Sequence, residues 1–230
     1  MGCDIHFFVE VKQPDGTWKE VVTNLVWGWD GATQVSLGDP ITKEEMIERR
    51  KVNGYNPDYD DMWDVKYYNG RNYSLFSVLA DVRNYEYGIK PIDEPRGLPE
   101  DVSKTIKDFE EERRDGIHSQ TWLLLSEILK YKWNKVYDVW GYVDEDVWHE
   151  WQTSDALHPE SYCVGSCFQE IIDEEDYLAG NIPDGEVSIA CRWREPISSL
   201  CGSFYRVTIP KLKTLAKKSS DVRCVFWFDS

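Results

Sequence analysis

The sequence predicts an α/β protein of the α+β kind, a single compact domain in which helices pack on a mixed sheet containing both the N-terminal and the C-terminal strand. Strongly apolar, strand-like segments stand near the two ends of the chain, at residues 3–12 and 223–228. Between them, apolar residues recur at helical spacing in several segments. A chain of 230 residues can bury one sizeable core, and it shows neither an internal repeat nor a flexible linker.

The N-terminal segment 3–12 is predicted to be a strand because Val, Ile and Phe dominate it. Successive side chains of a strand point to opposite faces. Asp4 and His6 should therefore share one face, whereas the apolar residues that alternate with them should face the core. A turn signal then predicts that the chain returns as a second strand. The turn is expected at residues 14–16 and the returning strand at 17–22.

The middle of the chain is predicted to be mainly helical, with one irregular excursion. Residues 53–72 are rich in Gly, Asn, Asp and Tyr, and long irregular segments of this kind are often functional. The proline-rich segment 91–99 is expected to be a loop. The strongest helix should begin after Ser119, whose hydroxyl is a suitable cap. Helices are predicted over residues 43–51, 74–84, 103–114 and 120–132.

The C-terminal half is predicted to return to strands. The acidic segment at about 143–190, which follows a predicted strand, gives no consistent pattern. Pro210 is expected to open a helix, because proline suits the first helical position. The two terminal strands are each apolar on at least one face, so burying both predicts that they lie in one sheet. The remaining predictions are strands at 136–142, 204–209 and 223–228 and a helix at 210–218.

The charge balance excludes some partners. Lys and Arg number 26 against 42 Asp and Glu, which gives a formal net charge of −16. Duplex nucleic acid needs a cationic face to displace its counterions, and an anionic membrane would repel the chain, so neither is an expected partner. No apolar run is as long as a membrane span, and the start does not resemble a signal peptide. The expected location is the cytoplasm, with the six cysteines as reduced thiols, and homo-oligomers are allowed.

Five short segments of the N-terminal half form a recognisable set. They are Met1-Gly2-Cys3-Asp4-Ile5-His6, Arg71-x-Tyr73-x-Leu75-Phe76, Val82-Arg83-Asn84, Pro95-Arg96-Gly97-Leu98-Pro99 and His118-Ser119. Together they resemble a family of uncharacterised proteins of bacteriophages and some bacteria. The resemblance implies no activity. It implies a viral or prophage origin, and hence action in the host cytoplasm at the host–phage interface, for example by capturing a host defence signal.

Asp4 and His6 are the sharpest candidate pair for chemistry. Their carboxylate and imidazole can reach one point, which suits a divalent metal or general acid–base work. The alternative is that His6 makes a structural hydrogen bond on a half-buried face. The Asp-x-His strand also resembles the first motif of metallophosphoesterases, but the later histidine motifs of that family are missing. Asp4 and His6 are thus candidate metal ligands and, with His118, candidate catalytic residues if the protein is an enzyme.

A second set of residues points to a phosphorylated ligand. Guanidinium groups bind phosphate through paired hydrogen bonds, although surface ion pairs are the alternative for each arginine. Backbone N–H groups at a helix start after Ser119 would add an anion site. Arg83 and Arg96 are expected to face one cavity near His118. The candidate ligand-binding residues are Arg71, Arg83, Asn84, Arg96, Ser103, Ser119 and Trp122.

The sequence therefore predicts a phage-type protein that binds a small phosphorylated, nucleotide-derived ligand. One alternative is a metal-dependent phosphoesterase or related hydrolase that uses Asp4 and His6. The other is a non-enzymatic structural or partner-binding phage protein. A divalent metal is the only cofactor that the residues suggest.

Overall fold

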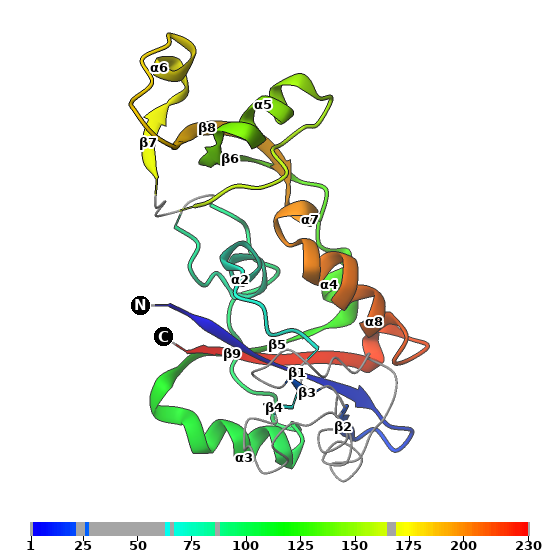
Figure 1. Ribbon diagram of the computed structural model, residues 1–230. Helices are drawn as coiled ribbons and strands as arrows, with labels where there is room; N and C mark the ends of the chain where they lie inside the picture. The colour runs from blue at the N-terminus through cyan, green and yellow to red at the C-terminus, as the bar shows by residue number, and fades with distance from the viewer. Residues whose placement is uncertain are drawn as a thin grey trace, which may run out of the picture. The chain divides into compact units, whose positions relative to one another are not determined.

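The computed structural model describes residues 2–21, 67–85, 88–164 and 169–229, together with the backbone of residues 26–27 and 63–64. Helices and sheets are mixed in the α+β manner that the sequence predicts (Figure 1). Contacts divide the chain into two compact units. Unit 1 comprises Met1–Asn84, Ile89–Tyr131 and Ser203–Ser230, and unit 2 comprises Tyr85–Gly88 and Lys132–Gly202. The single domain expected from the sequence stays a prediction.

The main sheet of unit 1 joins the two ends of the chain. Its strands are β1 (Asp4–Lys12), β2 (Trp18–Glu20), β5 (Ile117–Leu124) and β9 (Val222–Asp229), in the order β2-β1-β9-β5. The first and last strands are direct neighbours, with Asp4 opposite Asp229 and Val11 opposite Val222 (Figure 1). This confirms the prediction that both terminal strands share one sheet. All three pairings in this sheet are antiparallel.

The apolar face of β1 packs as its alternation predicts. Cys3, Ile5, Phe7 and Val9 are buried, and the Phe7 ring stacks on Phe226 with a centroid distance of 5.7 Å. Strand β9 is buried on both faces, because its other side packs against α3 (Lys104–Arg113) through Trp227 and Ile106. A strand covered on both faces needs apolar side chains at successive positions, and residues 224–228 are all apolar.

Helix α2 (Tyr73–Ala80) begins and ends on local signals. The Asn72 side chain accepts a hydrogen bond of 2.8 Å from the Leu75 N–H, which caps the start. Asp81 closes the helix in the left-handed conformation with a φ of 57°. The helix therefore stops short of the predicted residue 84. It lies against the sheet through Phe76, whose ring centroid is 4.9 Å from that of Phe228.

Unit 2 contains a three-stranded sheet in which each strand runs directly into a helix. Its order is β6-β8-β7, with β6 antiparallel and β7 parallel to β8. The last residue of each strand, Asp144, Asp173 or Pro196, is extended and is also the N-cap of the helix that follows. The elements are β6 (Val136–Asp144), α5 (Glu145–Thr153), β7 (Glu170–Asp173), α6 (Glu174–Leu178), β8 (Val187–Pro196) and α7 (Ile197–Leu200).

The acidic segment that the sequence left unassigned contains the helices α5 and α6. Their first turns hold several of its carboxylates, and one tyrosine hydroxyl connects the two helices. Five of its carboxylates, those of Glu145, Asp146, Glu174, Glu175 and Asp176, fall in the first turns of α5 and α6, where the helix dipole favours negative charge. The Tyr177 hydroxyl donates to Glu145 Oε1 at 2.5 Å and lies 2.8 Å from His149 Nε2, so it joins the two helices. Burial, followed by the bond to Glu145, raises the pKa of Tyr177 to about 12.

Two sequence predictions in unit 1 are wrong. The predicted helix 120–132 is instead β5 followed by the short helix α4 (Leu125–Lys130), because residues 117–124 complete the sheet beside β9. Ser119 therefore caps no helix, and the predicted anion site at a helix start does not form there. The predicted strand 204–209 is a helical turn, η2 (Phe204–Thr208), that continues into α8 (Ile209–Lys213). Burial in this segment falls on Phe204 and Thr208, four residues apart, rather than on alternate residues.

Part of the prediction lies outside the described residues. The helix expected at 43–51 lies there, as does the excursion at 53–72 except for residues 67–72 and the backbone of β4 (Trp63–Asp64), which pairs antiparallel with β3 (Val26–Trp27). The remaining described elements are two short turns, η1 (Arg114–Gly116) and η3 (Ser219–Asp221).

None of the described helices has the length and apolar character needed to cross a membrane.

Candidate functional site

The beginning of β1 and the end of β9 bring together residues from distant parts of the chain. Arg71 holds the carboxylate of Asp4 with two hydrogen bonds, of 2.8 Å from Nε and 2.6 Å from Nη2. Both side chains are about half exposed, at 54% for Arg71 and 53% for Asp4. The hydrogen bond from Arg71 lowers the pKa of Asp4 and outweighs the opposing effect of burial. Asp4 therefore stays ionised and orients the Arg71 guanidinium.

His6 is oriented by the last strand rather than by Asp4. Strand alternation places Asp4 and His6 on the same face, as predicted. His6 Nε2 lies 2.9 Å from Asp229 Oδ2, and the Asp4 N–H donates to the other oxygen of Asp229 at 3.2 Å. The His6 ring also packs against both Phe109 and Trp227, with both centroid distances at 5.9 Å. The site thus contains a carboxylate–imidazole pair whose acidic member was missed from sequence.

The arrangement of Asp4 and His6 does not fit a divalent metal site. Both oxygens of Asp4 accept hydrogen bonds from Arg71, and His6 Nε2 is directed at Asp229. Within the described segments, no three His, Cys, Asp or Glu side chains are grouped so that they could hold a metal ion. The observed pairs instead resemble the structural alternative considered for His6.

The other face of the same strand end carries Cys3, Tyr73 and Arg83. The Cys3 N–H donates to the Tyr73 hydroxyl at 3.2 Å, and the Arg83 guanidinium lies 5.8 Å from the centre of the Tyr73 ring. Burial raises the pKa of the Cys3 thiol, and a hydrogen bond from Arg83 only partly offsets this, so Cys3 is a poor nucleophile. Arg83 has a φ of 57°, a left-handed conformation that is strained for any residue except Gly.

Gly2 allows Arg71 to lie against the backbone. A Cβ atom at Gly2 would stand 2.7 Å from Arg71 Nη1, so any side chain there would displace the guanidinium. The bonds to Asp4 use Nε and Nη2, and no hydrogen-bond partner of Nη1 is found among the described residues. Sequence reasoning treated Gly2 only as part of a motif, because the approach of residue 71 cannot be read from local pattern.

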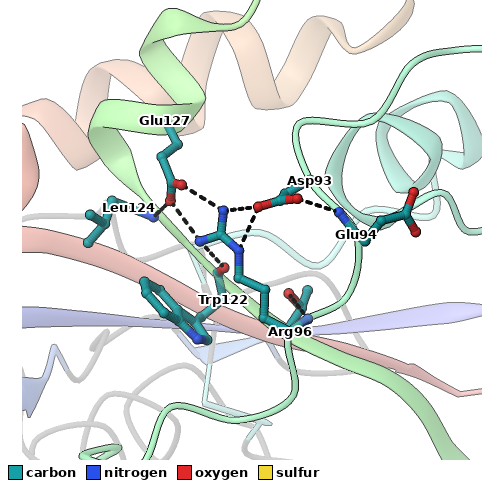
Figure 2. A network of polar contacts seen from close by, with 7 residues as sticks. Asp93, Glu94, Arg96, Trp122, Leu124 and Glu127 are labelled. Carbon is teal, nitrogen blue, oxygen red and sulfur yellow. Dashed lines mark hydrogen bonds and ion pairs between the residues drawn. The ribbon is translucent and has the colours of Figure 1, made fainter.

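Arg96, by contrast, is fully engaged by the protein (Figure 2). It bonds to Asp93 through Nε and Nη2, to both oxygens of Glu127 through Nη1 and Nη2, and to the Trp122 carbonyl through Nη1. A guanidinium has five N–H donors, and these contacts use all of them. A phosphate could bind Arg96 only by displacing one of these acceptors. The side chain therefore ties the loop at 93–97 to β5 and α4.

Acid should weaken the Arg96 network. Burial alone would raise the pKa of Glu127, but bonds from Arg96 and from the Leu124 N–H outweigh it and lower the pKa; Arg96 likewise lowers the pKa of Asp93. Carboxyls with lowered folded pKa values stabilise the protein above their unfolded pKa, near 4, and lose this effect as pH falls through the folded values. We would measure the free energy of unfolding of wild type and of the Arg96→Ala variant in urea at several pH values from 7 to 3. The difference between the two free energies should become smaller below about pH 4, and a difference that is constant with pH would contradict this.

A buried ion cluster beside β1 and β9 was also missed from sequence. Arg223 donates from Nε to Glu10 Oε2 and from Nη1 to Asp101 Oδ1, both at 2.6 Å. The side chains of Arg223 and Glu10 are 3% and 0% exposed. Glu10 also accepts the Ser103 N–H at 2.7 Å, which fixes the start of α3 on the sheet. The predicted ligand residue Ser103 thus takes part in a structural cluster through its backbone.

The remaining candidates lie apart from the Asp4–Arg71 pair. The Asn84 amide bonds to Asp81 and to the Ile89 backbone, and so closes its own loop. His118 is opposite Phe228, which is opposite Ile5, so its side chain lies on the sheet face away from His6. The expected cavity shared by Arg83, Arg96 and His118 stays a prediction.

Comparison of the chain with family models, curated proteins and solved structures finds no significant match.

Proposed function

We propose that the protein binds a small phosphorylated, nucleotide-derived ligand beside residues 2–4, with the Arg71 guanidinium as the main phosphate donor. The observation that carries the proposal is the state of Arg71. Asp4 orients it, Gly2 leaves it room, and Nη1 makes no hydrogen bond to any described residue. An oriented guanidinium with unused donors is suited to a phosphate oxygen.

Comparison with the other arginines supports this choice. Arg96 uses all of its donors within the protein, and Arg223 is buried among carboxylates. Arg71 is half exposed and uses only two nitrogen atoms. Arg83 contacts Cys3 and Tyr73, so a second guanidinium borders the same stretch of backbone and we assign it a supporting role.

The overall charge limits the size of the ligand. At a net charge of −16, each further phosphate that extends beyond the local arginines meets repulsion. This favours a short ligand with few phosphates over a nucleic-acid chain. The resemblance to phage proteins adds the proposal that the ligand is a host defence signal, which the protein captures rather than converts.

Replacing Arg71 by Ala should weaken ligand binding without unfolding the protein. Losing hydrogen bonds to a charged group costs about 1.5–3 kcal/mol, which corresponds to roughly 10–150-fold in Kd. The ion pair with Asp4 is exposed to solvent, so its loss should change the stability of the protein little. Calorimetric titration with nucleoside phosphates, dinucleotides and inorganic phosphate measures the effect, and recovery of unchanged ligand after denaturation distinguishes capture from hydrolysis.

Arg194→Ala is the matched control, because Arg194 is an exposed arginine paired with Asp138 in unit 2. It should bind like wild type. Equal Kd values for Arg71→Ala and wild type, or no binding of any phosphate compound by wild type, would remove the site.

A further inference from the structure

Strand β5 contains an irregularity at Ser119. His118 is opposite Phe228 and Thr121 is opposite Phe226, so two residues of β5 stand where β9 has only Trp227. An extra residue of this kind is a β-bulge, and bulges often re-aim a side chain near a functional site. Ser119 has a φ of 54°, the left-handed region that suits Gly. A serine held in this conformation is strained, and such strain is a starting point for a functional hypothesis.

The hydroxyl of Ser119 is paired with an imidazole. Its Oγ lies 3.0 Å from His118 Nδ1. When the imidazole carries its proton on Nε2, Nδ1 accepts the hydroxyl proton, which is how histidine activates a serine. The His118 ring stacks on the buried Phe228 ring at 6.0 Å and 26°, so packing fixes the imidazole. Both residues are partly exposed, so a substrate and water can reach them.

We propose that Ser119 is a nucleophile activated by His118, and that the protein hydrolyses small carboxylic esters at this bulge. The described contacts of the two side chains include no Arg or Lys, which favours a neutral carbonyl over a phosphate. The proposal does not rest on the phosphate site, because the described hydrogen bonds of Arg71 go to Asp4, whereas Ser119 and His118 bond to each other.

The reaction has two steps. Ser119 Oγ bonds to the ester carbonyl carbon while His118 Nδ1 takes the hydroxyl proton. The bond to the alcohol oxygen then breaks, and the imidazolium returns that proton to the leaving alcohol. In the second step water attacks the acyl carbon while His118 Nδ1 takes its proton; the bond between that carbon and Ser119 Oγ then breaks, the imidazolium returns the proton to Oγ, and the acid is released.

A fluorophosphonate probe and p-nitrophenyl acetate test the proposal on the full chain. The probe should label wild type on the peptide containing Ser119. Ser119→Ala should lose the label and His118→Gln should react at least about 100-fold more slowly, with ester hydrolysis falling in parallel. Ser126→Ala, which changes another half-buried serine of unit 1, should behave like wild type. Arg71→Ala should also keep the label, which separates this activity from phosphate binding.

Ser119→Gly guards against a loss caused by misfolding. Glycine suits the positive φ, so this variant should lose the label while its Tm stays level or rises by up to about 4 °C. Absence of the label from Ser119 in wild type would overturn the proposal. Ester hydrolysis by the Ser119→Gly variant at the wild-type rate would show that Ser119 is not the nucleophile. An unchanged rate for the His118→Gln variant would show that His118 is not the base.

Discussion

Replacing Glu10 by Ala should lower the free energy of unfolding by about 3 kcal/mol or more. Arg223 is 3% exposed and Glu10 is 0% exposed, so the substitution leaves a buried guanidinium without its nearest carboxylate. Removing one partner of a buried ion pair costs about 3–5 kcal/mol. Asp101 still accepts from Arg223, which keeps the expected loss toward the lower end of that range. The Ser103 N–H also loses its acceptor at the start of α3.

Urea unfolding followed by Trp fluorescence measures this loss, and a double variant identifies its cause. Glu10→Met combined with Arg223→Met removes both charges and keeps apolar volume. It should recover most of the lost stability, because replacing a whole buried pair is often nearly neutral. A Glu10→Ala variant within about 0.5 kcal/mol of wild type would show that the cluster is not a significant part of the core. A double variant as unstable as the single one would point to packing rather than unpaired charge.

Replacing Arg96 by Ala should cost about 1.5–3 kcal/mol, the range for hydrogen bonds that involve charged groups. The loop at 93–97 would lose its connection to α4, and Glu127, which is 29% exposed, would lose its cation. Asp93 is more exposed, so water should compensate most of its share. Thermal and urea unfolding measure the change.

Arg96→Lys is the informative control for the Arg96 network. Lysine keeps the positive charge but cannot reproduce the fork that reaches Asp93 and Glu127 together, so its stability should fall between wild type and alanine. Titration of the alanine variant with nucleotides also separates two roles for Arg96. Weaker ligand binding with unchanged stability would favour the phosphate role predicted from sequence, and the reverse would favour the structural role.

The early and late strands were predictable because their signal is local. Alternation along residues 3–12 determines which side chains of β1 share a face, and this holds whatever the partner strand. The apolar run at 224–228 fills a strand buried on both sides. The same alternation placed Asp4 and His6 together on one face, before any contact of either was known.

The segment after Ile117 shows where local pattern fails. Trp122, Leu125 and Ile128 have helical spacing, but Thr121 and Leu123 alternate as a strand requires, and the sequence supports both. The free side of β9 decides between them, since a strand there satisfies backbone groups that a helix would leave unpaired. The helix starts only at Leu125, where Glu127 accepts the Leu124 N–H at 2.7 Å.

The sequence by itself determined the α+β class, the terminal strands and the faces of β1, because these depend on residues close together in the chain. The tertiary structure alone decided what each charged residue does. Arg96 finds Glu127 across 31 residues, Arg71 finds Asp4 across 67, and Arg223 finds Glu10 across 213. The free energy of a charged group depends on burial and on the partner within hydrogen-bond reach. Folding sets both burial and partner. As a result, three arginines that look alike in the sequence have different roles: Arg96 connects a loop to α4, Arg71 is the candidate ligand donor, and Arg223 is a buried ion.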